Sequence, residues 1–276
     1  MRGKWSYLLF LPAVLFIISF LVVPILLTMV STVQVDGGWT LSGYTNFFKD
    51  YYLRDIYFRT LKIAGITTIL AAFLGFPTSY YISRSAKKYR GIFLVLAVFP
   101  LLTSPVVRSF SWMIILGKNG IINDILMTLS LVDEPLNLLY TEFSVITGLL
   151  YLFLPLMILS LVGVMENIDG ELIRAAESLG ASKFKAFMKI VFPLSLPGLI
   201  IGTALVFTGS FTAYTTPMLL GGDKTRVLST LIYENALSLF NWEQASIIAA
   251  VMIITTFTIV ILINYFSDKL NPGGVK

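Results

Sequence analysis

Six long apolar runs constrain the fold of this chain more than any other feature of its sequence. They cover approximately residues 7–30, 60–82, 92–116, 143–164, 194–215 and 246–266. A helix that crosses the hydrocarbon core of a bilayer needs about 20 such residues, so each run is long enough to span it. Only 13% of the residues are charged, about half the fraction found in a soluble domain. The sequence therefore predicts an all-α integral membrane protein with six transmembrane helices.

The basic residues predict the orientation of these helices. The two termini, the connection between spans two and three, and that between spans four and five hold twelve of the 20 Lys and Arg residues. The other three connections hold five, or seven if Arg59 and Lys62 at the mouth of the second span are included. Because cytoplasmic segments collect Lys and Arg, both termini are predicted to be cytoplasmic. The first run exceeds the roughly 7–15 apolar residues of a secretory signal and no small-residue cleavage site follows it, so it is expected to be retained.

The chain is expected to divide into two regions. Residues 1–55 would hold the first transmembrane helix and an outer segment, whose aromatic residues between 44 and 58 predict a short interfacial helix. Residues 56–267 would form a transmembrane domain of helices two to six, with a cytoplasmic loop at 165–193. The two halves differ in loop lengths and proline positions, so no internal repeat is predicted.

The residue types that are missing exclude several kinds of chemistry. Without Cys or His, the chain cannot form disulfides, thiol nucleophiles, Ser-His-Asp triads or His-ligated zinc sites. It has no G-x-x-x-x-G-K-[ST] phosphate loop, so ATP and Mg²⁺ would have to be bound by another chain. The net charge of +5 does not indicate nucleic-acid binding. We therefore expect no catalytic residue, metal site or cofactor here, and a transport subunit is favoured over an enzyme.

The loop at 165–193 carries a local pattern of two short helices. Asp169 is placed to cap the first helix, and Gly180 to end it in the left-handed conformation. Ser182 would cap a second helix that runs to Pro193, with one apolar face made of Phe184, Phe187 and Ile190. Physical reasoning leaves two alternatives for this element. It could dock a partner protein, or it could lie as an amphipathic helix on the inner membrane surface.

The spacing within the loop resembles the Glu-Ala-Ala loop of permease subunits of binding-protein-dependent ATP-binding-cassette (ABC) importers. That pattern has Glu-Ala-Ala, three residues, Gly, nine residues, Ile, one residue and Leu-Pro. The sequence matches it at Ala175, Ala176, Gly180, Ile190 and Pro193. The resemblance implies a coupling loop between helices four and five that contacts a cytoplasmic ATPase.

Two positions depart from that pattern. Arg174 stands where the family has Glu, and Phe192 where it has Leu. The family Glu is associated with contact to the ATPase, and Arg174 lacks the carboxylate for that salt bridge. Glu171 and Glu177 lie three residues from Arg174 on neighbouring helix faces, and either is a candidate substitute.

The remainder of the chain looks like the spermidine/putrescine branch of the family, at residues 99–112, 116–123, 193–198 and 217–222. Permeases for iron, sulfate, phosphonate and opines are similar, so the solute stays open between polyamines and these. The resemblance implies a location in the bacterial inner membrane. Besides membrane lipid, it implies three kinds of protein partner. They are a second permease that is a paralogue of this chain, two copies of an ATPase, and an extracytoplasmic solute-binding protein.

Six residues are candidates for the solute path. They are Arg108, Trp112, Thr208, Phe211, Thr212 and Tyr214. A charge inside a span is expensive and marks function by default, although Arg108 could instead snorkel outward or pair structurally. Rings such as Trp112 can hold a cation, but they can equally be packing. Thr208, Thr212 and Thr216 would share a helix face, lining the path or joining helices.

Two competing functions remain on the residues alone. A self-sufficient secondary transporter usually shows internal repeats and often carries membrane-embedded acids, and no Asp or Glu lies within the six runs. A structural or assembly protein would leave the spacing of the loop unexplained.

Overall fold

The computed structural model describes residues 4–35 and 38–270, and its regular secondary structure is helical apart from one short hairpin. Five helices are long and apolar enough to cross a membrane. They are Phe10–Ser31, Tyr51–Arg84, Glu142–Met165, Lys183–Thr212 and Trp242–Tyr265. Two further helices, Lys87–Leu102 and Pro105–Thr128, are bent by 94° relative to each other and count as a sixth crossing if they are taken as one span. The described chain is therefore an all-helical protein with five or six candidate spans.

The chain forms two compact units, and the first holds residues 1–56 and 231–254. Its apolar N-terminal run comprises α1 (Lys4–Ile17), the π-helical segment η1 (Ile18–Val22) and α2 (Val23–Ser31). The strands β1 (Gln34–Val35) and β2 (Gly38–Trp39) pair antiparallel, and α3 (Ser42–Lys49) follows. The unit also contains η4 (Glu234–Ser238) and the beginning of α13 (Trp242–Leu270).

The second unit, residues 57–230 and 255–276, holds the other membrane helices. Most of α4 (Tyr51–Arg84) belongs to it, as do α5 (Lys87–Leu102), α6 (Pro105–Leu116), α7 (Ile121–Thr128), α8 (Glu142–Met165) and α9 (Gly170–Ser178). A continuous helical stretch follows, made of α10 (Lys183–Ala186), η2 (Phe187–Val191) and α11 (Phe192–Thr212). The unit continues through η3 (Pro217–Gly221) into α12 (Leu228–Tyr233).

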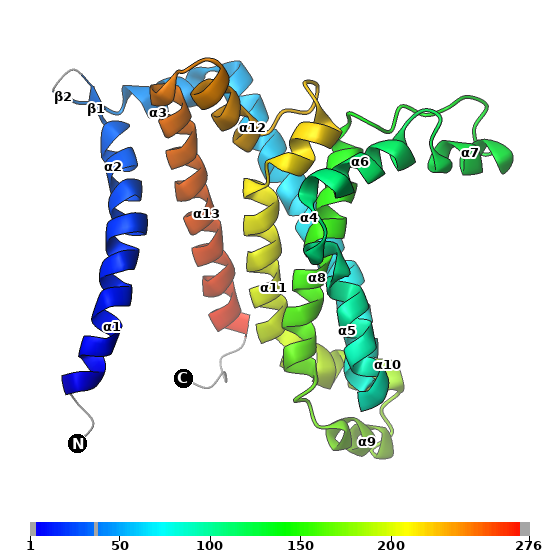
Figure 1. The fold of residues 1–276 in the computed structure, drawn as a ribbon. Helices are drawn as coiled ribbons and strands as arrows, with labels where there is room; N and C mark the ends of the chain where they lie inside the picture. Colours follow the sequence, from blue (N-terminus) through cyan, green and yellow to red (C-terminus); the bar gives the residue numbers. More distant parts are fainter. Residues whose placement is uncertain (1–3, 36–37, 271–276) are drawn as a thin grey trace. The chain divides into compact units, whose positions relative to one another are not determined.

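The helices α8 and α11 form the packing centre of this unit (Figure 1). Met157, Leu161 and Met165 of α8 are fully buried in one apolar cluster with Val206 of α11. Gly198 allows the close approach, because a Cβ atom added there would lie 2.7 Å from the backbone oxygen of Ser160. The missing side chain of Gly198 therefore lets α8 and α11 pack closely.

The expectation of one straight third span over 92–116 is wrong. The helix ends at Leu102, and α6 and α7 turn away from α5 by 94° (Figure 1). Ser104 leaves the helical conformation because a residue before proline avoids it, and Thr103 is extended. Pro105 then begins α6, where its missing N–H leaves no hydrogen bond unmade.

Two expectations about helix ends are also wrong. Pro193 does not end the second loop helix, because the π-helical segment η2 precedes it and the helix runs on into α11. The fifth span was expected to reach residue 215, but α11 ends at Thr212 and Ala213 is extended. Thr216 therefore does not continue the helix face of Thr208 and Thr212.

Candidate functional site

Arg108 lies just after the break between α5 and α6, and its side chain donates hydrogen bonds to residues before the break. The residue is 6% exposed, and its Nη1 donates to the carbonyl oxygen of Pro100 at 2.8 Å and to Thr103 Oγ1 at 3.4 Å. Carbonyls at the end of a helix have no partner within it. The structure thus favours structural pairing over snorkelling for this arginine. Within the described part of the chain, its Nη2 is buried without a hydrogen-bond partner.

An aromatic pocket of about 280 Å³ adjoins this break. The rings of Trp112 on α6 and Tyr151 on α8 form one edge-to-face pair, with centroids 5.7 Å apart. Its walls also include Phe99, Thr103, Arg108 and Ser111. The pocket joins two of the predicted path residues, Arg108 and Trp112. Sequence reasoning missed Tyr151, because nothing in the apolar run of α8 distinguishes the one ring that meets Trp112.

The other four path candidates do not line this pocket. Phe211 is fully buried and stacks on Phe207, with centroids 5.5 Å apart, so in this chain it is a core residue. Thr212 Oγ1 donates to the Thr208 carbonyl at 2.8 Å, a bond within the helix. The Tyr214 hydroxyl contacts the sulfur of Met218. Any role of these four in a path stays a prediction.

The helix caps and the glycine turn of the loop at 165–193 are those that the sequence predicts. The Asp169 carboxylate accepts from the N–H of Glu171 at 2.9 Å, and Ser182 Oγ accepts from the N–H of Lys185 at 3.2 Å. Between the two helices, Gly180 has a φ of +86°. Ala175 and Ala176 lie within α9, so Gly180 ends that helix as expected. These caps and the glycine turn are confirmed.

The apolar face of the second loop helix is divided between solvent and core. Phe184 is 74% exposed, and Leu179 at the end of α9 is 89% exposed. Phe187 instead packs edge-to-face against Tyr80, with ring centroids 5.1 Å apart. The predicted apolar residues therefore differ in environment: Phe184 is exposed, whereas Phe187 packs against α4.

The arginine in place of the family Glu is paired within its own helix. Arg174 Nη2 lies 3.2 Å from Glu171 Oε1, and both side chains are more than two-thirds exposed, at 71% and 78%. Glu171, one of the two candidate substitutes for the family Glu, is the residue that pairs with Arg174. Such an exposed pair contributes about 0–1 kcal/mol, so both groups remain available to another protein.

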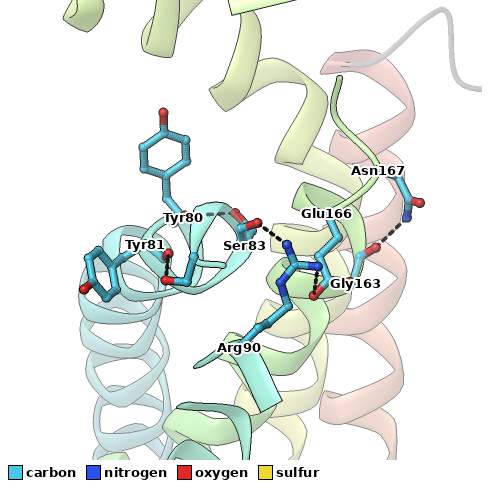
Figure 2. A network of polar contacts seen from close by, with 8 residues as sticks. Tyr80, Tyr81, Ser83, Arg90, Gly163, Glu166 and Asn167 are labelled. Atoms are coloured by element: carbon cyan, nitrogen blue, oxygen red, sulfur yellow. Dashed lines mark hydrogen bonds and ion pairs between the residues drawn. The ribbon is translucent and has the colours of Figure 1, made fainter. Parts of the chain in front are cut away.

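Two arginines connect the beginning of the loop to the turn between α4 and α5 through hydrogen bonds and an ion pair. Figure 2 shows Arg90 between Ser83 and Glu166: Nη2 donates to the Ser83 carbonyl at 2.8 Å, and Nη1 lies 3.3 Å from Glu166 Oε1. Arg84 Nη1 donates to the carbonyl of Ile168 at 3.0 Å. Opposite charges 76 positions apart follow no local pattern, and the sequence alone could not pair them.

Reversing either charge of the Arg90–Glu166 pair is expected to loosen the loop. Both side chains are about one-third exposed, so the pair is worth more than one on the open surface. We expect Arg90→Glu or Glu166→Arg to speed amide hydrogen exchange in residues 165–180 by about tenfold, or ~1.4 kcal/mol. The double reversal should restore most of the protection. Arg174→Glu, which breaks only the exposed pair, is the control and should change little; equal loosening by this control would refute the anchoring role.

Comparison with known proteins identifies the family. Residues 68–273 match the model described as "Binding-protein-dependent transport system inner membrane component". The spermidine/putrescine transport system permease protein PotB of Haemophilus influenzae is 33% identical over 261 residues, covering 92% of this chain and 91% of the relative. PotB of Escherichia coli is 31% identical over 204 residues, or 74% of each chain.

Solved structures show the same fold. A bacterial ABC transporter involved in the import of the acidic polysaccharide alginate aligns with a TM-score of 0.81 at 17% identity, covering 96% of this chain and 95% of that one. The alginate transporter in complex with its pentasaccharide-bound periplasmic protein gives 0.81 at 18% identity, covering 98% and 96%.

The matched family model covers α4 from its middle, the broken third crossing, the loop and the last three crossings. Relatives at about one-third identity extend the likeness over nearly the whole chain. The chain belongs to the inner membrane components of binding-protein-dependent transport systems, and it is the permease subunit of an ABC importer.

Proposed function

We propose that this permease carries polyamines of the spermidine/putrescine type across the bacterial inner membrane. The observation that carries the proposal is the similarity to spermidine/putrescine permeases, at 33% and 31% identity over 92% and 74% of the chain. The aromatic pocket supports it, since a cation binds favourably over Trp and Tyr rings. Arg108 lines the same pocket and bonds only to neutral oxygens, so a cationic solute there would need an acid of a partner protein to compensate its charge.

The proposed topology follows the basic residues. With both termini in the cytoplasm, the α4–α5 turn and the loop at 165–193 face the cytoplasm, and α6–α7 lie toward the outside. Residues 56–267 would then act as the transporting domain, and 1–55 as an added helix with its outer segment. The Lys and Arg residues near the loop, Arg84 to Arg90 and Lys183 to Lys189, support this orientation.

The loop at 165–193 is proposed to dock an ATPase, which would bind ATP and Mg²⁺. Leu179 and Phe184 are large apolar side chains exposed on a short polar loop, and such contacts carry most of the energy of an interface. Glu171, Arg174 and Glu177 would form the charged rim around them. Two ATPase copies, a second and paralogous permease, and an extracytoplasmic solute-binding protein would complete the importer.

ATP hydrolysis by the complex purified through this chain tests the function. Reconstituted with its binding protein, the complex would be challenged with spermidine, putrescine, ferric iron and oxyanions. Stimulation by a polyamine alone is the expected result. Stimulation only by an anion or iron would keep the importer and refute the polyamine assignment, while a complex without ATPase would refute the docking role of the loop.

Removing the larger ring of the aromatic pocket is expected to weaken polyamine transport. A desolvated cation–π contact is worth about 2 kcal/mol, so Trp112→Ala should raise the half-saturating polyamine concentration by about 30-fold. Ile114→Ala provides the control, since Ile114 lies on the same helix, does not line the pocket and is 72% exposed. Equal half-saturation in both variants and the parent would place the cation elsewhere.

A further inference from the structure

A second cavity lies at the turn between α4 and α5. This turn pocket has a volume of about 430 Å³ and takes its walls from both helices, chiefly Tyr80, Tyr81, Arg84, Tyr89 and Phe93. The rings of Tyr81 and Phe93 are 5.8 Å apart, which joins the two walls. It shares no lining residue with the aromatic pocket. Its walls combine tyrosine rings with one guanidinium group, which is a suitable lining for an amphipathic anion.

Positive charge without an acidic partner lies in and next to the lining of the turn pocket, since Arg84 lines it and Lys87 and Lys88 stand between the lining residues Ala86 and Tyr89 in the sequence. Arg84, Lys87 and Lys88 are exposed, and no ion pair joins any of the three to an acid in the ranges 4–35 and 38–270. Arg84 donates to a neutral carbonyl, so its charge is not cancelled. Lys88 lies 5.8 Å over the ring of Tyr89. Of the four basic residues at this turn, Arg90 alone forms an ion pair within the described residues, and its partner is Glu166 (Figure 2).

The surface that continues from the turn pocket is apolar. The membrane helices α4 and α5 both expose large hydrophobic side chains, with Phe73 at 74%, Ile92 at 55% and Leu96 at 65%. Tyr rings at the ends of such helices sit at the depth of lipid headgroups. An amphipathic ligand can therefore place its charge among Arg84 and the lysines while its chains lie along the helices. A soluble anion would contact the basic residues but not the apolar surface of the helices.

We propose that the turn pocket binds an anionic phospholipid, with the headgroup phosphate held by Arg84, Lys87 and Lys88. Basic pockets between membrane helices on the cytoplasmic side favour such headgroups. The assignment to the cytoplasmic leaflet rests on the proposed orientation of the chain. Tyr80 forms one wall and also packs against Phe187 of the coupling loop, so a bound lipid supports the position of that loop.

Lipid binding can be measured on the intact transporter complex by native mass spectrometry. The detergent-purified complex would be titrated with phosphatidylglycerol, with phosphatidylcholine and with inorganic phosphate. We expect retained phosphatidylglycerol and little phosphatidylcholine. Lys87→Gln/Lys88→Gln should weaken phosphatidylglycerol binding by about 25-fold, from roughly fivefold for each lysine. Ala86→Trp keeps all the charges but fills the pocket, and it should also lower occupancy.

The matched control is Lys183→Gln/Lys185→Gln, which removes the same charge from exposed positions on α10. Equal lipid loss in both double variants would show diffuse attraction and overturn the proposal. Displacement of the lipid by millimolar phosphate would make the pocket a site for soluble anions. If the Lys87/Lys88 variant lost the ATPase but kept its lipid occupancy, the surface at the turn pocket would be a docking face for the ATPase and not a lipid site. A complex that never contains an ATPase would refute the proposed coupling role and leave lipid occupancy as a separate result.

Discussion

Replacing Leu179 or Phe184 by Asp is expected to uncouple the permease from its ATPase. Both side chains are largely exposed, at 89% and 74%, so the isolated chain should lose less than about 0.5 kcal/mol of stability. In the complex, each would be an apolar anchor of the interface, and its replacement by a charge should cost about 2–4 kcal/mol of association. We expect co-purified ATPase and ATP-driven import to fall by roughly 30-fold or more.

A matched control separates docking from surface polarity in general. Leu131 is 65% exposed on the connection between α7 and α8, which the proposed topology places on the opposite membrane face. Leu131→Asp should therefore leave the ATPase bound. If Leu179→Asp and Phe184→Asp also retained the ATPase and full import, the loop would not be the docking element. An amphipathic helix on the membrane surface would then describe it better.

The loop was predictable because its structure is local. Asp169 and Ser182 cap helices through bonds to residues two and three positions away, and Gly180 adopts the φ of +86° that its lack of a Cβ allows. None of these features depends on distant parts of the chain. The Glu171–Arg174 pair is likewise one helical turn apart. What the sequence could not supply was the contact of Phe187 with Tyr80, because the two residues lie more than 100 positions apart.

The membrane spans were predictable for a different reason, and the broken third crossing shows the limit of that reasoning. Hydropathy detects a run of apolar residues whether or not the helix through it is straight. Ser104 before Pro105 signalled a helix boundary. The apolar character of the segment outweighed that signal, although a backbone bent within the membrane is tolerated where its carbonyls find partners. Arg108 is that partner, bonded to Pro100 and Thr103.

The largest effect on assembly is expected from Gly198 in α11. A Cβ atom there would meet the backbone oxygen of Ser160 at 2.7 Å and the Cα of Leu161 at 3.2 Å. Backbone atoms of α8 cannot rotate aside as a side chain can, so Gly198→Leu must push the two helices apart. Overpacking costs about 1–3 kcal/mol even where the core adjusts. We expect at least ~3 kcal/mol, an unfolding midpoint lower by about 10 °C, and little monodisperse complex.

Gly202 and Gly163, on the same pair of helices, provide an intermediate case and a control for this prediction. At Gly202 the nearest atoms are the Met157 sulfur and Ser160 Oγ, each at 2.5 Å, and these side-chain atoms can move, so Gly202→Leu should cost less than Gly198→Leu. Gly163 on α8 has no atom within 4 Å of an added Cβ, so Gly163→Leu is the control and should keep the parent midpoint. Because all three substitutions add the same side chain to a membrane helix, hydrophobicity cannot explain a graded loss. Equal midpoints for Gly198→Leu and Gly163→Leu would mean that α8 and α11 do not approach through Gly198.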